Sequence, residues 1–417
     1  MPHKASPSRC KGLAVAGSVL LIATFLSGCS SSGSSGGVSS SSSSGSSTKA
    51  ITVGYTNLES SGNSLPEWRY GGQAAISYIN AHGGINGAQI KPVFCYVDGS
   101  PESSINCANE FVNDRVALDF VGVDVGIGSA LPVLQNAGIP VIGTVGTSTQ
   151  LSNPDSFVLH GGNGPDIAAL AQALKDAGAA KITFIDLSGL GAGATAAFEI
   201  AKAVAPRLGI GISELQVPVT NTDWTSVVAS ALAGKPDGFV LDLSEDGCTS
   251  VLQALHAANF KGTSDGPCSN YLRVLGNSAP PTVAATAVWT PDLRQYAPQD
   301  VQSRLDIYTN AMKTSGHADV VNSPGASRTF SGWMELAQIL RGIKGPINTA
   351  SVKTGLQGAS DVPGYLGPNL HCGKGVWPSE PSVCSAQELL LRIEPSSNGP
   401  KRAPVGNAFV DLSNLAG

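Results

Sequence analysis

The sequence predicts an α/β protein made of two doubly wound, parallel-sheet lobes. Short β-rich runs alternate with helical segments from residue 51 onward, and the series starts again after a proline-containing break at 153–165. Parallel strands need a helical crossover between them, so this alternation predicts repeated β-α-β units. The chain of 417 residues is also too long for one simple core and suits two.

The N-terminus carries an export signal, predicted over residues 1–28. Three basic residues within the first eleven precede an uncharged run at 12–29 that ends in Leu-Ser-Gly-Cys. This order is typical of a secretory signal rather than a membrane span. The last four letters resemble the bacterial lipoprotein signal, in which the cysteine is acylated and becomes the new N-terminus. We therefore expect Cys29 to be lipidated, the alternative being an ordinary signal peptide with an incidental cysteine.

Residues 29–49 form the predicted link between the lipid and the globular body. After Cys29 the segment is nearly all serine and glycine. Such a composition has no apolar surface to bury and predicts a flexible tether, about 25 Å from end to end for 20 residues. The protein is therefore expected to stay on the outer face of the cell membrane.

Charge and cysteine content exclude several classes of partner. The net charge is -5, and no basic run lies in the mature body, so nucleic acid is not an expected partner. Neither CxxC nor HExxH spacing occurs, so we expect no metal. Apart from Cys10 and Cys29, six cysteines remain, and in an exported protein a locally paired set predicts disulfides. The expected bridges are Cys95 with Cys107, Cys248 with Cys268, and Cys372 with Cys384.

The first helix is predicted to end sharply. Gly83 and Gly84 follow an apolar helical stretch, and glycine is the usual residue beyond a helix C-terminus. Asn86-Gly87 is then a turn dipeptide that leads into the next strand.

The remaining elements follow from periodicity and capping residues. Two helices at 299–316 and 327–343 are expected to return to the first lobe, and the Pro-rich tail to lie against the second. Between the early strands, helices are predicted at 101–114 and 166–178. The predicted strands are 51–55, 90–97, 117–123, 139–143, 181–187, 212–219 and 237–243.

Four stretches, taken in order, resemble the solute-binding lipoproteins of branched-chain amino acid type ABC transporters: 51–62, 71–90, 117–148 and 221–243. The resemblance implies a periplasmic binding protein of type I. Its two lobes are joined by a three-crossover hinge and close around a small molecule, which is delivered to a membrane permease. A binding lipoprotein that senses its ligand without transporting it is the alternative. The protein is expected to be a monomer.

The resemblance also implies the division into lobes. Lobe 1 is expected to comprise 50–163 with about 293–355, and lobe 2 to comprise 164–292 with about 356–417.

Ligand contacts are implied on the loops at the strand ends, although turn chemistry or helix capping would also explain these residue types. The loop after 187 lacks the tyrosine that amino acid binders often carry there, so the ligand class stays open between an amino acid, an amide, a short-chain acid and a sugar-like solute. Glu245 would suit a ligand ammonium, but capping by Glu245 or Asp246 is an equal alternative. The implied residues are Asn57, Glu59, Ser60, Ser61, Ser129, Thr144, Gly146, Thr147, Ser188, Leu190, Ser244, Glu245 and Asp265.

Two segments resemble enzyme signatures, but neither has the expected context. Gly189, Gly191 and Ala194 have the spacing of a dinucleotide fingerprint, but a tethered exported protein has little access to such a cofactor. Ser264 lies in a G-x-S-x-G frame, but a helical run rather than a strand is predicted before it. The histidines at 82, 160, 256, 317 and 371 show no triad spacing and are expected to be solvated or capping residues. We therefore expect neither an enzyme nor a cofactor.

Overall fold

The computed structural model describes residues 50–60, 62, 64–188, 192–220, 222–266, 268, 270–396, 400–406 and 408–416. Residues 48–417 form one compact unit. The signal, the tether, Cys29, Ser61, Leu190 and two glycines of the dinucleotide-like motif, Gly189 and Gly191, lie outside the described residues. In the described part, no helix is both long and apolar enough to span a membrane.

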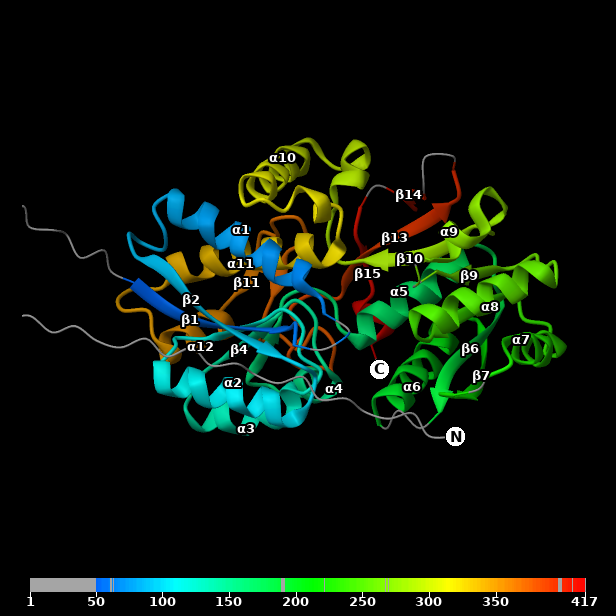
Figure 1. The fold of residues 1–417 in the computed structure, drawn as a ribbon, viewed down its shortest axis with the longest axis horizontal. Coiled ribbons are helices and arrows are strands. Elements are labelled where there is room, and N and C mark those ends of the chain that lie inside the picture. The colour runs from blue at the N-terminus through cyan, green and yellow to red at the C-terminus, as the bar shows by residue number, and fades with distance from the viewer. Residues whose placement is uncertain are drawn as a thin grey trace, which may run out of the picture. The chain divides into compact units, whose positions relative to one another are not determined.

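The first sheet has five parallel strands in the order β2-β1-β3-β4-β5 (Figure 1). The predicted break at 153–165 in fact contains the fifth strand, a three-residue strand flanked by Asn153-Pro154 and Gly161-Gly162, which are typical of loops. The strands are β1 (Ala50–Leu58), β2 (Gln89–Val97), β3 (Asp119–Val121), β4 (Val141–Gly143) and β5 (Ser156–Val158). The helices with this sheet are α1 (Pro66–Ala81), α2 (Pro101–Asp114), α3 (Ile127–Asn136), α4 (Ser148–Leu151), α10 (Gln299–Thr314), α11 (Pro324–Gly342) and α12 (Thr349–Gln357).

The turn after α1 has the predicted form. Gly83 and Gly84 have φ of 92° and 64°, and Asn86 and Gly87 are also left-handed. A Cβ at Gly84 would lie 2.0 Å from the main-chain oxygen of Ala88, so only glycine fits there.

The second sheet has eight strands in the order β14-β13-β10-β9-β8-β6-β7, with β15 paired to β13. Five of them are parallel, whereas β13 runs antiparallel to β10, β14 and β15, an edge that the sequence did not predict. The strands are β6 (Lys181–Ser188), β7 (Gly211–Pro218), β8 (Gly238–Asp242), β9 (Thr263–Asp265), β10 (Thr282–Thr286), β13 (Gln387–Glu394), β14 (Lys401–Pro404) and β15 (Val410–Asp411). The helices are α5 (Asn163–Asp176), α6 (Ala192–Leu208), α7 (Trp224–Ala233), α8 (Glu245–Ala257) and α9 (Asn270–Leu275).

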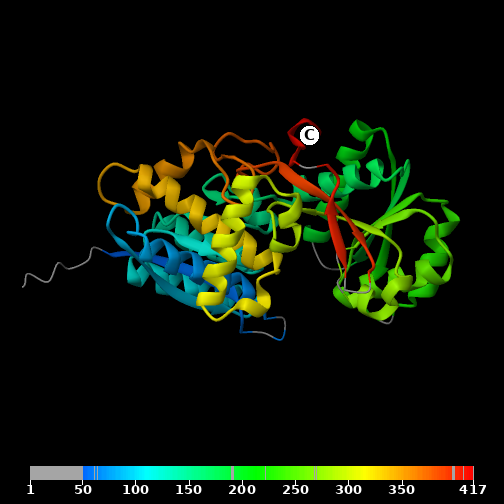
Figure 2. The same cartoon turned by 90° about the horizontal axis from the view of Figure 1, so that it is seen from above.

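The chain passes between the two sheets three times, as the resemblance implied. The first crossover joins β5 to α5, the second follows β10, and the third leads into β13. In Figure 2 the yellow and orange helices of the return segment lie with the first sheet, where α10 and α11 both contact α1. The remaining short elements are β11 (Ser360–Val362), β12 (Leu370–His371), η1 (Gly276–Ser278), η2 (Pro291–Tyr296), η3 (Ala318–Val320) and η4 (Ser413–Leu415).

The tail is divided between the two cores. Leu366, Cys372 and Cys384 pack in the cluster that contains the first sheet, and Val383 bridges to Val158 of β5. Strands β13, β14 and β15 belong to the second sheet. The predicted lobe boundaries remain a proposal, because Trp377 and Val383 of the same tail pack in the cluster of the second sheet.

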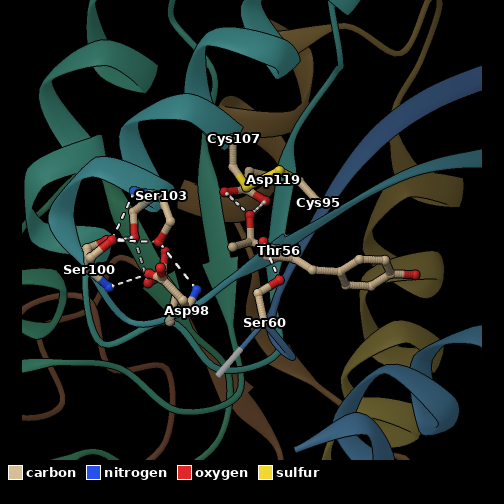
Figure 3. Close-up of a disulfide and its surroundings, with 11 residues drawn as sticks. Thr56, Ser60, Cys95, Asp98, Ser100, Ser103, Cys107 and Asp119 are labelled. Carbon is tan, nitrogen blue, oxygen red and sulfur yellow. Dashed lines mark hydrogen bonds between the residues drawn. A yellow bond between two sulfur atoms is a disulfide. The ribbon is translucent and has the colours of Figure 1, made fainter. Parts of the chain in front are cut away.

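The three predicted disulfides are confirmed: Cys95–Cys107, Cys248–Cys268 and Cys372–Cys384. The first ties β2 to α2, as Figure 3 shows. The second ties α8 to the segment after β9, and the third closes the loop that follows β12.

Candidate functional site

The loop after β1 is held by an internal network. Asn57 is 1% exposed, donates from Nδ2 to the oxygens of Leu65 and Glu59 at 2.9 Å each, and accepts at Oδ1 from the Val123 amide at 3.1 Å. Glu59 forms a bidentate ion pair with Arg69, with N–O distances of 2.8 and 2.9 Å. Both predicted ligand residues are therefore committed to fixing this loop, and a ligand contact by either remains a prediction.

Ser60 and its neighbours lie at the end of β1, close to the first disulfide (Figure 3). The Ser60 hydroxyl donates to the main-chain oxygen of Tyr96 at 3.2 Å. Hydrogen bonds from Ser100 and Ser103 lower the pKa of the exposed Asp98 to about 2. This carboxylate therefore orders the start of α2 and stays charged.

The loops after β3 and β4 meet. A Cβ at Gly128, in the first turn of α3, would lie 3.1 Å from Thr149 of α4. Ser129 is exposed on the first turn of α3. Thr147, the residue that follows Gly146, caps α4 by accepting from the Gln150 amide. Ser129 and Thr147 are thus brought to one region of the first lobe.

Thr144, also predicted to contact ligand, lies inside the lobe instead. It is fully buried, and a Cβ at Gly332 of α11 would lie 2.5 Å from its methyl group. Its hydroxyl has no hydrogen-bond partner in the described part of the protein. The side chain points toward α11 because residues in a strand-like segment alternate sides.

Two buried carboxyls of the first lobe were missed by the sequence analysis. Asp124, 5% exposed, accepts at Oδ1 from Ser104 and the Gly126 amide at 2.8 Å each, and burial raises its pKa. Asp119 accepts from Thr56 at 3.1 Å, and burial raises its pKa to about 7 (Figure 3). Both could have been recognised in the sequence as aspartates that lie inside an apolar strand or directly after one.

In the second lobe, capping explains part of the predicted set. Ser244 is the N-cap of α8 and accepts from the Gly247 amide at 3.3 Å, while Glu245 is exposed in the first turn. Ser188 is partly exposed at the end of β6. Asp265 is only 2% exposed and accepts from the Leu241 amide at 2.9 Å, and burial raises its pKa to about 8. Asp265 therefore belongs to the interior of the lobe.

Asp186 and Asp242 occupy paired positions at the carboxyl ends of β6 and β8, where ligands of doubly wound sheets bind. Asp186 is fully buried and accepts from Gln216 at 3.3 Å. Burial, Glu214 and Asp242 together raise its pKa. Neither residue was predicted to contact a ligand, although both lie in the predicted strands 181–187 and 237–243.

A groove of about 550 Å³ opens between α4 and α6. Along one wall, the Asn163 side chain at the start of α5 donates to the Ser148 hydroxyl of α4 at 3.1 Å. Ser148 is the residue that follows Thr147. The polar lining of the groove includes Glu199, which pairs with Lys202, and Glu380, which accepts from the Gly164 amide at 3.0 Å. No basic side chain is among the lining residues: Ser148, Ser152, Asn163, Ala196, Glu199, Ile200, Ala203, Val204, Trp377, Ser379, Glu380 and Leu415. Such a surface suits a small molecule with an apolar body and hydrogen-bond donors.

His160, at the first crossover, is neither solvated nor a cap, so that expectation was wrong. It is fully buried, and its Nε2 lies 2.7 Å from Oε2 of Glu335 in α11. Glu335 also accepts from the Tyr365 amide and the Ser331 hydroxyl. A buried pair of this kind fixes the position of the crossover against α11.

Ser264 is the middle residue of β9, and helix α8 rather than a strand precedes this segment, as expected, so Ser264 does not lie on the strand-to-helix turn of a nucleophile elbow. The residue is 4% exposed, and its hydroxyl donates to the main-chain oxygen of Asp265 at 2.8 Å. Over the described residues, no group of three or more His, Cys, Asp or Glu side chains is arranged to hold a metal ion.

A family profile described as periplasmic binding protein matches residues 51–376. A search of curated protein sequences finds no match.

Solved structures share the fold at low sequence identity. A substrate-binding periplasmic protein from Ralstonia solanacearum is 18% identical, with a TM-score of 0.67 over 85% of this chain and 99% of its own. The branched-chain amino acid transporter substrate-binding protein LivJ from Streptococcus pneumoniae, in complex with isoleucine, is 14% identical, with a TM-score of 0.67 over 86% and 99%. A fatty acid ABC transporter substrate-binding protein from Thermomonospora curvata is 15% identical, with a TM-score of 0.67 over 88% and 94%.

Proposed function

Because the chain belongs to the periplasmic binding protein family, we propose that it is the solute-binding lipoprotein of an ABC importer. The observation that carries the proposal is the groove between α4 and α6, which is lined by Asn163 directly after the first crossover and by Glu380 before the third. Bending at the crossovers would close such a groove around a small molecule. In this proposal the protein is a monomer on the outer face of the membrane, performs no chemistry on the ligand and hands it to a permease.

We propose a small polar ligand, such as an amino acid or a related amide or organic acid. The groove has an apolar wall from α6 and hydroxyl, amide and carboxylate groups opposite. The S. pneumoniae protein holds isoleucine, and the T. curvata protein is described as serving a fatty acid transporter. Ligands within this fold therefore differ in class, and the test must span several classes.

A thermal-shift screen of amino acids, amides, organic acids, fatty acids and sugars tests the proposal. A ligand at one hundred times its Kd adds about 2.7 kcal/mol to the free energy of unfolding. The expected result is a raised Tm with members of one class. If no compound in any class raises the Tm, the proposal that this protein binds a small solute has failed.

Ser129 and Thr147 do not line the groove, but Thr147 precedes Ser148 of its wall, and we propose that the two hydroxyls hold the polar end of that ligand. Removing one leaves a desolvated ligand group unpaired, which costs about 1 to 3 kcal/mol, or roughly 5- to 150-fold in affinity. Calorimetric titration of Ser129→Ala and Thr147→Ala measures this loss. Thr147→Ser, which keeps both the hydroxyl and the α4 cap, is the matched control and should bind like wild type.

Glu245→Ala, measured in the same way, reports the ligand's charge. It should weaken a cationic or zwitterionic ligand but not an anionic or neutral one, because only an ammonium is attracted by the carboxylate. Wild-type affinity in both Ser129→Ala and Thr147→Ala would show that these strand-end loops are not the binding site.

Transport and sensing predict different phenotypes. Deletion of the gene should abolish uptake of the radiolabelled ligand found in the screen, if the protein serves a permease. Unchanged uptake with an altered transcriptional response would favour the sensing alternative.

A further inference from the structure

Two carboxyl side chains meet at the first crossover. Asp166 lies in the first turn of α5, and Glu388 lies at the start of β13, where the third crossover enters the second sheet. A Cβ placed on Gly161 would lie 2.7 Å from Asp166 Oδ1 and 3.0 Å from Glu388 Oε1. Both oxygens therefore lie against the same point of the first crossover.

Gly161 allows this approach because it has no side chain. Its φ of +69° is in the left-handed region, and Gly162 beside it has φ of +156°. Two consecutive glycines at this point leave the crossover able to change its backbone angles. The carboxyl pair thus contacts the segment that must bend when the lobes move.

If both side chains were charged carboxylates, the pair would lack hydrogen-bond donors. Glu388 is fully buried, and neither of its oxygens, nor Oδ1 of Asp166, has a hydrogen-bond partner in the described part of the chain. Unpaired buried carboxylates are costly, whereas one proton between two carboxyls satisfies both. Burial and the negative charge of Asp166 raise the pKa of Glu388 well above its ordinary value, while Arg328 opposes the shift.

The surrounding charges come from several elements. Arg328 belongs to α11 of the first lobe, and Glu380, beside Gly162, has its pKa raised to about 7 by burial and by Asp166. His160 and Glu335 form the neighbouring buried pair. The other charged groups on elements packed against β13 are Lys175 and Asp176 at the far end of α5, Lys401 and Arg402 of β14, and Asp411 of β15.

We propose that Asp166 and Glu388 share one proton at the hinge, and that its release as the pH rises changes the angle between the lobes. Without the proton, two adjacent negative charges repel each other across Gly161. The added charge also attracts Arg328, which is carried by the first lobe, while the carboxyls are carried by α5 and β13. Protonation therefore selects between two hinge positions, and solute capture depends on pH. This inference rests on the proposed function for its biological meaning.

The lobe arrangement can be measured without ligand. Spin labels at Val112→Cys in α2 and Val274→Cys in α9, both exposed positions, report the distance between lobes in a chain with Cys10 and Cys29 replaced by serine. We expect the mean label distance in this otherwise wild-type chain to differ between pH 5 and pH 8 by more than about 2 Å. Glu388→Gln should keep the pH 5 distance at both pH values, because glutamine stays neutral and can donate to Asp166.

The controls separate the pair from a general effect of pH. Glu394→Gln makes the same change at an exposed position on the same strand and should keep the wild-type shift. If Glu388→Gln does not fold, Asp166→Asn tests the same shared proton and should also abolish the shift. Equal distances at pH 5 and pH 8 in the wild type, or a full shift in a folded Glu388→Gln or Asp166→Asn, would overturn the inference. The outcome of the ligand screen is independent of either result.

Discussion

At the scale of residues, the protein is unusual in its buried carboxyls. Burial raises the pKa of Asp119 to about 7, of Glu380 to about 7 and of Asp265 to about 8. Each such group binds its proton more tightly in the folded state than in the unfolded chain. The stability that each group contributes is therefore greatest at pH values below its pKa in the unfolded chain. This contribution is lost as the pH rises through the pKa of the group in the folded protein.

The Asp265→Asn variant tests, at one position, whether stability falls as the pH rises. The amide oxygen can still accept from Leu241, so the variant should be as stable as wild type at pH 4. Wild type should lose stability between about pH 4 and pH 8, by about 1.4 kcal/mol per pH unit from this group, and the variant should not. Urea unfolding at several pH values measures this loss of stability, and Asp246→Asn, at an exposed position, is the control. Parallel pH profiles for wild type and Asp265→Asn would contradict it.

The candidate site was only partly predictable at this scale. Ser129 and Thr147 were selected because their residue types and strand-end positions are visible in the sequence. Thr144 and Asp265 have the same visible features, but the structure turns their side chains into the interior. Asp124 and Asp186 were missed because their burial depends on Ser104, Gln216 and other residues distant in the sequence.

At the scale of elements, long strands and local disulfides were predictable, but short or edge elements were not. β5 and β9 have three residues each, and unlike the equally short β3 and β4 they do not lie within a longer apolar run: Asn153-Pro154 precedes β5, and β9 is Thr-Ser-Asp. β13 contains Leu389–Leu391, a run with good helix propensity, and it becomes a strand by pairing with β10 and β14. The secondary structure of the tail could therefore not be predicted without knowing which strands it pairs with.

Two disulfides of equal loop length allow the effect of burial to be isolated. Cys95–Cys107 and Cys372–Cys384 each span 12 residues, so the chain-entropy loss should be about 3 kcal/mol for both. Cys372 and Cys384 are both completely buried, whereas Cys95 is partly exposed. Replacing both cysteines of a pair by serine should cost about 1 to 3 kcal/mol more at the buried pair, because the new hydroxyls are desolvated. Equal urea midpoints for the two double variants would contradict a burial effect.

At the scale of the whole molecule, the sequence predicted two lobes because the β-α-β series starts twice. The predicted boundary near residue 355 remains a proposal: Leu366, Leu370 and Cys372 pack with the first core, whereas Trp377 and Val383 pack with the second before β13 joins the second sheet. The globular body is compact over residues 48–417, which makes its folding separable from the proposed lipid anchor.

That separation gives a direct test of membrane attachment. The proposed acylation at Cys29 would place at least two chains on the protein, enough for stable membrane binding, whereas the body has no described helix that could span the bilayer. Wild type should therefore partition into the detergent phase, and Cys29→Ala into the aqueous phase. Cys10→Ala is the matched control, because Cys10 lies in the segment that is expected to be removed, and it should behave like wild type. The Tm of the body should be the same in all three proteins. Detergent-phase partitioning of Cys29→Ala equal to that of wild type would show that the protein is held by something other than this cysteine.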